Sequence, residues 1–278
     1  MLPDLLQNIA TTIATFVLGA ATCTLVELSL CAERQGWSSR LRGFLFTSLS
    51  LAAAVLMTAL TQQLMHGAHL TPLFALDLAS TIHSSNPLVI TFGYTVAPLI
   101  GILVYDVGYY LFHRLQHTVP FLWRYHALHH SIEELNAFNS YHHVSEYLFR
   151  IPLLTIPLNL LFAVSEPQVV ITAALVSVVG KLGHANTRID FGPLRYLVTE
   201  PRFHRIHHSI EERHWNRNFS FYFPVLDVLF RPAYWPAKDE LPRTGVDYLP
   251  EARSLNAFLF PAAPPEAAPR EELRASAT

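Results

Sequence analysis

The stretch "FLFTSLSLAAAVLMTALTQQLM", residues 44–65, contains no charged side chain. A helix of about 20 apolar residues is long enough to cross the hydrocarbon core of a bilayer. Two more stretches share this character, from Ile9 to Ala32 and from Leu88 to Phe112, and their only charges are Glu27 and Asp106. The sequence therefore predicts three membrane-spanning helices in the first 112 residues.

A fourth apolar region runs from Ile151 to Leu182 and is interrupted by "SEP" at 165–167. Each half is short for a full crossing, so a re-entrant hairpin or a tilted pair of helices is expected. The predicted fold class is an all-α integral membrane protein. It would have about four transmembrane helices or helical hairpins and a cytosolic, histidine-rich helical cap.

The composition supports a membrane location. The chain has 278 residues, of which 51% are hydrophobic and 14% are charged, whereas soluble domains carry about 25% charged residues. A net charge of -2 and the lack of any basic run exclude a nucleic-acid partner. The segment before Ile9 has no Lys or Arg, so the first apolar stretch is expected to be a retained anchor, not a signal peptide.

Basic residues predict the orientation. Residues 1–33 and 66–96 contain no Lys or Arg, whereas Arg34, Arg40 and Arg42 fill the expected loop between the first two spans. The positive-inside rule places that loop in the cytoplasm. The residues from His113 onward are then expected on the same, cytoplasmic side. The membrane itself would be a bacterial inner membrane or that of the endoplasmic reticulum.

Histidines gather in the part of the chain predicted to be cytoplasmic. Eleven of the 15 histidines fall between residues 113 and 208, and H-x-x-H-H occurs twice, in "HALHHS" (126–131) and "HRIHHS" (204–209). His113 and His117 are four residues apart, and both H-x-x-H-H motifs also place their histidines on one helix face. Neutral imidazole is the commonest ligand of first-row metals, and so many imidazoles predict two ions.

The absence of cysteine from this part of the chain excludes thiolate zinc sites and iron–sulfur clusters, but iron, zinc, copper and nickel all remain open. A membrane metal transporter or sensor is the main alternative to a redox enzyme. It would place ionisable ligands deep within the spans, where only Glu27 and Asp106 occur. A bis-histidine haem protein and a zinc hydrolase fit less well, and no H-E-x-x-H is present.

The run "DVGYYLFHRLQHTVPFLWRYHALHHS" (106–131), with "GHAN" (183–186) and "PRFHRIHHS" (201–209), resembles the sterol desaturase and fatty acid hydroxylase superfamily. The resemblance covers about residues 98–232. It implies a membrane enzyme that uses two non-haem iron ions, O2 and two electrons to hydroxylate or desaturate a lipid. Zinc is a possible substitute metal. The electrons would come from an external donor, a ferredoxin or a small cytochrome with its reductase, since no dinucleotide-binding fingerprint is present.

The resemblance also implies which residues bind metal. His184 of "GHAN" and His143 of "HVSE" (143–146) match further positions of the family pattern, although Val144 stands where the family has proline. His142 is not expected to bind. The implied ligands are His113, His117, His126, His129, His130, His143, His184, His204, His207 and His208. The residues expected to orient them are Asp106, Glu146, Asn186 and Asn218.

Three domains are expected. Residues 1–97 form a membrane anchor with two spans, and residues 98–236 form the catalytic domain, which includes the third span and the region 151–182. Residues 237–278 form an extension that is disordered from about residue 262, where Ala, Pro and Glu dominate. Near the end of the catalytic domain, Arg231 replaces a glycine usual in the family, which puts the local turn in question.

Overall fold

The computed structural model describes residues 2–76, 83–164 and 177–262. These residues form a helical protein with one pair of three-residue strands. In chain order the elements are α1 (Leu2–Ser29), α2 (Trp37–Gly67), β1 (Phe74–Leu76), α4 (Pro87–Tyr94), α5 (Val96–Thr118), α6 (Pro120–His130), α7 (Glu146–Arg150), η1 (Ile151–Thr155), α8 (Ile156–Leu161), β2 (Phe162–Val164), η2 (Gly192–Tyr196), α10 (Pro201–His207), η3 (Glu212–His214), α11 (Val225–Leu229) and α12 (Leu255–Leu259). Residues 177–183 are also helical.

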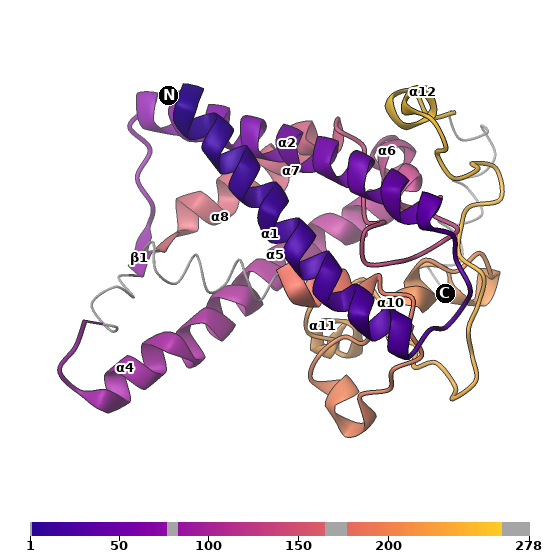
Figure 1. The fold of residues 1–278 in the computed structure, drawn as a ribbon. Coiled ribbons are helices and arrows are strands. Elements are labelled where there is room, and N and C mark those ends of the chain that lie inside the picture. Colours follow the sequence, from indigo (N-terminus) through magenta and orange to yellow (C-terminus); the bar gives the residue numbers. More distant parts are fainter. Residues whose placement is uncertain (1, 77–82, 165–176, 263–278) are drawn as a thin grey trace.

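Three helical segments are long and apolar enough to cross a membrane: Leu2–Ser29, Trp37–Gly67 and Pro87–Thr118. The second and third contain the predicted stretches 44–65 and 88–112, whereas the first begins seven residues before the predicted Ile9 and ends at Ser29, three residues short of the predicted Ala32. Leucines on their outer faces, such as Leu18 and Leu88, are 70% and 79% exposed, as expected of side chains that face lipid. In Figure 1, α10 and α12 lie toward the right-hand side of the molecule, and α4 and β1 lie toward the left. The predicted helical membrane fold is confirmed.

The third span is two helices, not the single helix that the sequence predicted. The break falls at Thr95, between α4 and α5, where φ is -116° and ψ is -66°. Pro98 lies three residues later. Because proline has no backbone N–H, the carbonyl of Tyr94 loses its usual helical partner at this point. The second helix, α5, continues past the predicted end of the span and carries both His113 and His117.

The fourth apolar region is described only at its two ends. It begins with the irregular helical run η1 and α8, followed by β2, and ends in the helix at residues 177–183. The predicted interruption at "SEP" (165–167) lies outside the described residues, as does the tail predicted to be disordered, apart from residue 262. Strand β2 pairs in parallel with β1, in the register Phe74 to Phe162, which the sequence pattern did not predict.

The predicted cytoplasmic loop between the first two spans is shorter than expected. Arg40 and Arg42 belong to the first turns of α2, and only Arg34 lies in the connection. Arg40 forms an ion pair of 2.8 Å with Glu27 of α1. The second carboxylate oxygen of Glu27 accepts hydrogen bonds of 2.8 Å from the backbone N–H groups of Ala137 and Asn186. One buried carboxylate thus ties α1 to α2 and to two loops near the histidines.

Replacing Glu27 with glutamine is expected to destabilise the protein by about 3–5 kcal/mol, because it leaves the Arg40 guanidinium buried without a counter-charge. The Glu27 side chain is fully buried and that of Arg40 is 10% exposed. The measurement is the thermal unfolding midpoint in detergent micelles. Glu211→Gln is the matched control, because Glu211 pairs with Arg213 at 2.8 Å while their side chains are 40% and 59% exposed, and such an exposed pair contributes below about 1 kcal/mol. Equal midpoints for the two variants would contradict this reading.

Helix α2 supports a backbone segment beside the histidines, residues 136–142, through small and polar side chains. Thr47 donates to the carbonyl of Phe138 at 3.1 Å, and Ser50 donates to the carbonyl of His142 at 2.6 Å. A Cβ atom at Gly43 would stand 2.7 Å from the Phe138 carbonyl oxygen, so this close approach requires glycine. A membrane helix therefore fixes the backbone that faces the histidine-rich region.

The described part of the C-terminal extension, residues 237–262, packs onto α2 and onto residues 136–142. Phe258 of α12 is fully buried and stacks on Phe46 of α2, with ring centroids 4.7 Å apart. Tyr141 packs edge-on against both rings. The cluster joins α2, α6 and the extension into one apolar core.

Candidate metal centre

Nine histidines form two groups in which the ring nitrogens lie within 4.8 Å of one another. We call them the five-histidine group and the four-histidine group. The five-histidine group consists of His113, His117, His126, His130 and His207. The four-histidine group consists of His129, His184, His204 and His208. All nine were predicted ligands, and the structure brings them together from four separate parts of the chain.

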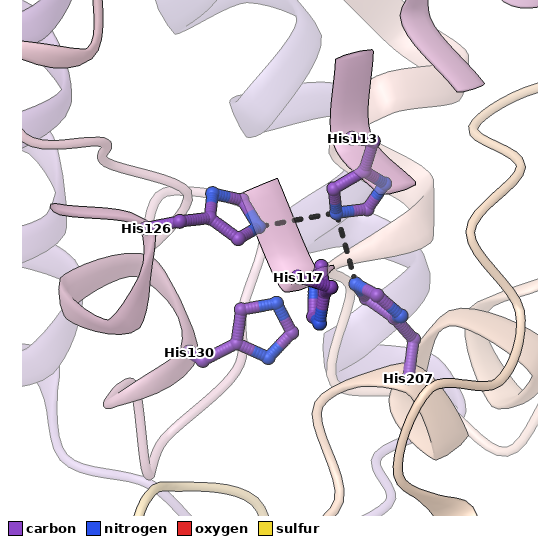
Figure 2. Close-up of side chains that lie close together, drawn as sticks. All are labelled: His113, His117, His126, His130 and His207. Carbon is purple, nitrogen blue, oxygen red and sulfur yellow. Dashed lines mark hydrogen bonds between the residues drawn. The ribbon is translucent and has the colours of Figure 1, made fainter. Parts of the chain in front are cut away.

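The five-histidine group is built on α5, α6 and α10 (Figure 2). The Nε2 atom of His113 lies 3.1 Å from Nε2 of His126 and 3.0 Å from Nε2 of His207. His117 and His130 complete the group with ring centroids 4.6 Å apart. Figure 2 shows the five rings turned toward a common centre.

The four-histidine group is built on α6, α10 and the end of the helix at residues 177–183. The Nε2 atoms of His184 and His204 are 3.0 Å apart, and the rings of His129 and His208 are 4.6 Å apart. The two groups touch, because the rings of His130 and His208 stack at 4.4 Å. Two-metal sites in enzymes have ions about 3.5–4 Å apart, so adjoining groups of this kind can hold a pair.

Each H-x-x-H-H motif contributes to both groups, with the roles exchanged. In α6 the first and last histidines, His126 and His130, join the five-histidine group and His129 joins the other. In and after α10 the outer pair, His204 and His208, joins the four-histidine group, and His207 crosses to the five-histidine group. Histidines four residues apart share a helix face, whereas the one between them points to the neighbouring site. Two copies of the motif therefore complete both groups.

The outer ring nitrogens are held by backbone carbonyl groups. The Nδ1 atoms of His113 and His207 lie 2.8 Å from the carbonyl oxygens of Phe219 and Arg217. In the four-histidine group, His129 bonds to the carbonyl of Tyr141 at 3.0 Å and His184 bonds to that of Asn139 at 3.1 Å. A carbonyl only accepts, so each Nδ1 carries the proton and each Nε2 presents a lone pair.

These lone pairs face one another without a proton between them. His113 and His207 meet Nε2 to Nε2 at 3.0 Å, a contact that two acceptors cannot hold unless a cation lies between them. Two nitrogens bound to one ion at about 2.1 Å lie roughly 3.0–3.4 Å apart. Buried nitrogens without a hydrogen-bond partner add to the pattern: Nε2 of His117, Nε2 of His130, and both ring nitrogens of His208. The donor set therefore fits metal binding.

Burial also keeps the imidazoles neutral. It lowers the pKa of His129, His204 and His208 well below the usual 6.5, and the neighbouring imidazoles lower each pKa further. Neutral imidazole is the form that binds a metal. The same shifts appear in the pKa values of His130, His184 and His207, and burial is again the largest cause.

Acidification is expected to destabilise the fold and to release bound metal. Because these folded-state pKa values lie below 6.5, the unfolded chain takes up protons that the folded chain does not as the pH falls below 6.5. Each such histidine then loses about 1.4 kcal/mol of stabilisation per pH unit until its folded pKa is reached. The check is the unfolding midpoint and the metal content between pH 7.5 and pH 5. A flat profile would contradict the burial of these rings.

His143, a predicted ligand, lies outside both groups. Its Nε2 bonds to the carbonyl of Leu259 at 3.2 Å, and its Nδ1 accepts from the N–H of Ser145 at 3.1 Å. Both nitrogens are thus occupied by backbone groups, and the prediction that His143 binds metal is not supported by this geometry. His142, which was not expected to bind, is the residue that faces the site, with its ring stacked 4.0 Å from that of His129.

Glu146 occupies the orienting position predicted for it. Its carboxylate lies 3.3 Å from Nδ1 of His126 and 3.3 Å from Nδ1 of His142, and it accepts a hydrogen bond from Gln116. A carboxylate on the outer nitrogen of a ligating imidazole fixes the ring and raises its basicity. His126, His142 and Glu146 also form a third cluster of possible ligand atoms.

Asp106, expected to orient a ligand histidine, makes no hydrogen bond to His113, which lies seven residues later in α5. Its carboxylate accepts instead from three successive backbone N–H groups, those of Phe221, Tyr222 and Phe223, at 2.8–3.3 Å. Seven residues along a helix do place Asp106 on the same face as His113, but the loop backbone lies nearer. Asp106 therefore acts through this loop, because the carbonyl of Phe219 in the same loop holds His113.

A second carboxylate supports the same loop. Asp227 accepts from the N–H groups of Phe219 and Ser220, both at 2.8 Å. Together with Asp106 it satisfies five consecutive amides, residues 219–223. Asp227 lies within residues 98–232, which the family resemblance covers, but it was not among the predicted site residues, because the sequence alone gives no sign of which backbone it faces. Burial raises its pKa to about 6.

The two asparagines predicted to orient ligands shape the backbone instead. Asn186 bonds to the backbone N–H and carbonyl of Glu33 at 3.1 and 2.6 Å. Asn218 has a positive φ of 58° and bonds to the backbone of Phe203 and Tyr234. Arg231, where the family has glycine, also has a positive φ of 69°, so the turn keeps the left-handed conformation despite the substitution.

Three cavities adjoin the histidines. One of about 200 Å³ is bordered by His117, His130 and His207 of the five-histidine group, together with Trp123 and Tyr248. The second, of about 120 Å³, reaches His129, His184 and His204 of the four-histidine group. The third, of about 390 Å³, lies among α1, α2, α5 and residues 177–181. The second and third share Tyr109, His142, Arg150, Lys181 and Phe221 among their lining residues, so they meet at these side chains.

Comparison with known proteins bears on the same part of the chain. Residues 98–232 match the family model described as fatty acid hydroxylase. Among curated proteins, "Ornithine lipid hydroxylase OlsE" of Rhizobium tropici is 34% identical over 149 residues. That alignment covers 53% of this chain and 45% of the relative, so the match spans less than half of the relative's length. No solved structure matches the chain.

Proposed function

Because the chain belongs to the sterol desaturase and fatty acid hydroxylase superfamily, we propose that it is a membrane enzyme that hydroxylates a lipid with O2 at two non-haem metal ions. The observation that carries this proposal is the contact of the unprotonated Nε2 atoms of His113 and His207 at 3.0 Å, and the Nε2 atoms of His184 and His204 lie equally close in the other group. Iron is the proposed metal, and zinc is a substitute that the same nitrogens would accept.

The reaction is balanced as follows. A lipid C–H bond and O2, with two electrons and two protons, give a lipid C–OH group and water. Bound iron would supply the redox chemistry that acid–base groups cannot perform on an unactivated C–H bond. Desaturation would use the same inputs, remove two hydrogens from the lipid and give two waters. We favour hydroxylation because both the matched family and the relative are named hydroxylases.

The chain's own residues have three tasks in this scheme. The carbonyls of residues 139, 141, 217 and 219 hold the imidazoles with Nε2 inward. Glu146 holds His126 and His142. The cavity of about 390 Å³ offers the lipid an apolar path from α1 to the four-histidine group. Water is kept from the centre because eight of the nine histidines are at most 5% exposed.

Domain limits, orientation and partners remain part of the proposal. Residues 1–97 would anchor the enzyme, residues 98–236 would carry the catalysis, and the metal centre would face the cytoplasm. A soluble ferredoxin or a small cytochrome with its reductase would deliver the electrons there. A metal transporter is a weaker alternative, because both groups of possible ligands are enclosed at one end of the spanning helices instead of lining a path through them.

The test combines metal analysis with lipid analysis. The purified protein should contain two iron ions per chain, and extracts of a host expressing the gene should contain a lipid that has gained one oxygen atom. The controls are an empty vector and His129→Ala, which should insert into the membrane normally but lose iron and product. Zinc alone in an inactive protein, or an unchanged lipid profile in the iron-loaded one, would count against the proposal.

A further inference from the structure

Two cationic side chains line the path from the membrane helices to the four-histidine group. Arg150, at the end of α7, and Lys181, in the helix at residues 177–183, border both the cavity of about 390 Å³ and the cavity of about 120 Å³. Both residues are half-buried. No histidine of the two groups is hydrogen-bonded to either residue, and the surrounding lining is largely apolar or aromatic.

Neither cation forms a close ion pair with a carboxylate among the described residues, and Glu146 acts on Arg150 only from beyond ion-pair distance. Lys181 donates to the hydroxyl of Ser140 at 2.7 Å and lies 4.7 Å from the centre of the Phe16 ring. Arg150 donates to the hydroxyl of Tyr105, and its guanidinium lies 5.6 Å from the centre of the Tyr109 ring. An ammonium has three donors and a guanidinium has five, so both retain donors for a further acceptor.

No Asp or Glu in the described part of the chain lines either cavity. The titratable groups on the walls are therefore the two cations, tyrosines and imidazoles, and two bound metal ions would add more positive charge. Charged groups removed from water are costly without a counter-charge. A cavity with this lining is electrostatically complementary to an anion.

The apolar part of the path is suited to a hydrocarbon chain. Phe16 of α1, Leu51 of α2 and Phe221 line the larger cavity together with threonines of α1, and Phe16 and Leu51 belong to membrane-spanning helices. The cations stand where this cavity meets the smaller one, which His129, His184 and His204 also line. A lipid entering from the bilayer would meet the cations just before the metal centre.

We propose that the substrate is a lipid with an anionic group, a carboxylate or a phosphate, which Lys181 and Arg150 hold beside the four-histidine group. This inference rests on the proposed function and narrows its substrate class. The cations and the three histidines border the same cavity of about 120 Å³, so the carbon presented for oxidation lies within a few bonds of the anionic group.

The test measures binding without turnover. Full-length, metal-loaded protein in nonionic detergent, under nitrogen and without reductant, is titrated with hexadecanoate, hexadecyl phosphate and hexadecan-1-ol. The wild type should bind at least one of the two anions about ten-fold more tightly than the alcohol, which is about 1.4 kcal/mol. In Lys181→Gln with Arg150→Gln this preference should fall to about two-fold, while alcohol binding and metal content stay unchanged.

Two controls separate charge at this site from other effects. Lys181→Arg should keep the preference because it keeps the charge, and Lys238→Gln should keep it because Lys238 is exposed and lines neither cavity. Acetate should not displace bound hexadecanoate, because it has no chain for the apolar cavity. Displacement by acetate would identify a site for small free anions and overturn the lipid assignment.

The outcomes distinguish this inference from the proposed function. Equal binding of the alcohol and both anions by a protein that oxidises a lipid would overturn the anionic substrate alone. An undiminished preference in the double variant would do the same. A clear preference in a protein that oxidises no lipid would support the anion site and count against the hydroxylase proposal.

Discussion

Replacing His207 with alanine is expected to abolish activity and to lower the metal content by about one ion per chain. His207 is the only residue of α10 in the five-histidine group. Its Nε2 lies 3.0 Å from that of His113, and its ring lies 4.6 Å from that of His130. Without His207, α10 contributes no nitrogen to the five-histidine group. Removing a residue that orients a ligand typically lowers metal affinity 10–100-fold, and removing a ligand itself should lower it further.

His214→Gln is the matched control for this variant. His214 is also a fully buried histidine of the same region, but its nitrogens contact Ser209 at 2.8 Å and Glu240 at 3.1 Å. Its replacement should leave metal content and turnover near the wild-type level. Metal and product would be measured on the same membrane preparations. Full metal content and full turnover in His207→Ala would remove the basis of the two-metal assignment.

Replacing Asp106 with alanine is expected to destabilise the metal centre although Asp106 contacts no histidine in either group. Three backbone N–H groups, of residues 221–223, would lose their acceptor. A buried donor left unsatisfied costs about 1–3 kcal/mol, so the total is several kcal/mol. The loop would then release the Phe219 carbonyl that holds His113. The unfolding midpoint and the metal content should fall together.

Asp106→Asn separates this role from a role of the charge. Asparagine keeps one carbonyl oxygen, which can still accept from part of the loop, so this variant should retain more metal than the alanine variant. If Asp106→Ala kept both its unfolding midpoint and its metal, the loop would not depend on this carboxylate. A loss of activity with full metal content would point to a different role for Asp106.

Much of the fold could be predicted from local pattern. The stretch at residues 44–65 and its two counterparts required helices that face lipid, and the structure contains all three. The break at Thr95 was missed because the residues on both sides of it are apolar, although Pro98 was a signal that could have predicted it. The strand pair β1–β2 was missed because three-residue strands carry too few side chains to show an alternation.

The candidate site was predictable in composition but not in arrangement. The spacing of His126, His129 and His130 placed them on one face of a helix, and the structure keeps that helix while dividing the three residues between two groups. Which of His142 and His143 faces the site also depended on tertiary contacts. Nε2 of His143 bonds to the carbonyl of Leu259, a residue 116 positions later in the sequence. No sequence pattern marks such a partner.

Local pattern was enough to predict the membrane helices and eight of the ligating positions proposed here, since hydrophobicity and helical period act between near neighbours, whereas His184 was implied only by the family resemblance. The folded chain path was needed to know which imidazoles meet, which ring nitrogen faces inward, and that Asp106 and Asp227 hold a loop instead of a histidine. Backbone carbonyl and N–H groups make these choices. Every residue carries them, so their partners are selected by the path of the folded chain and not by side-chain type.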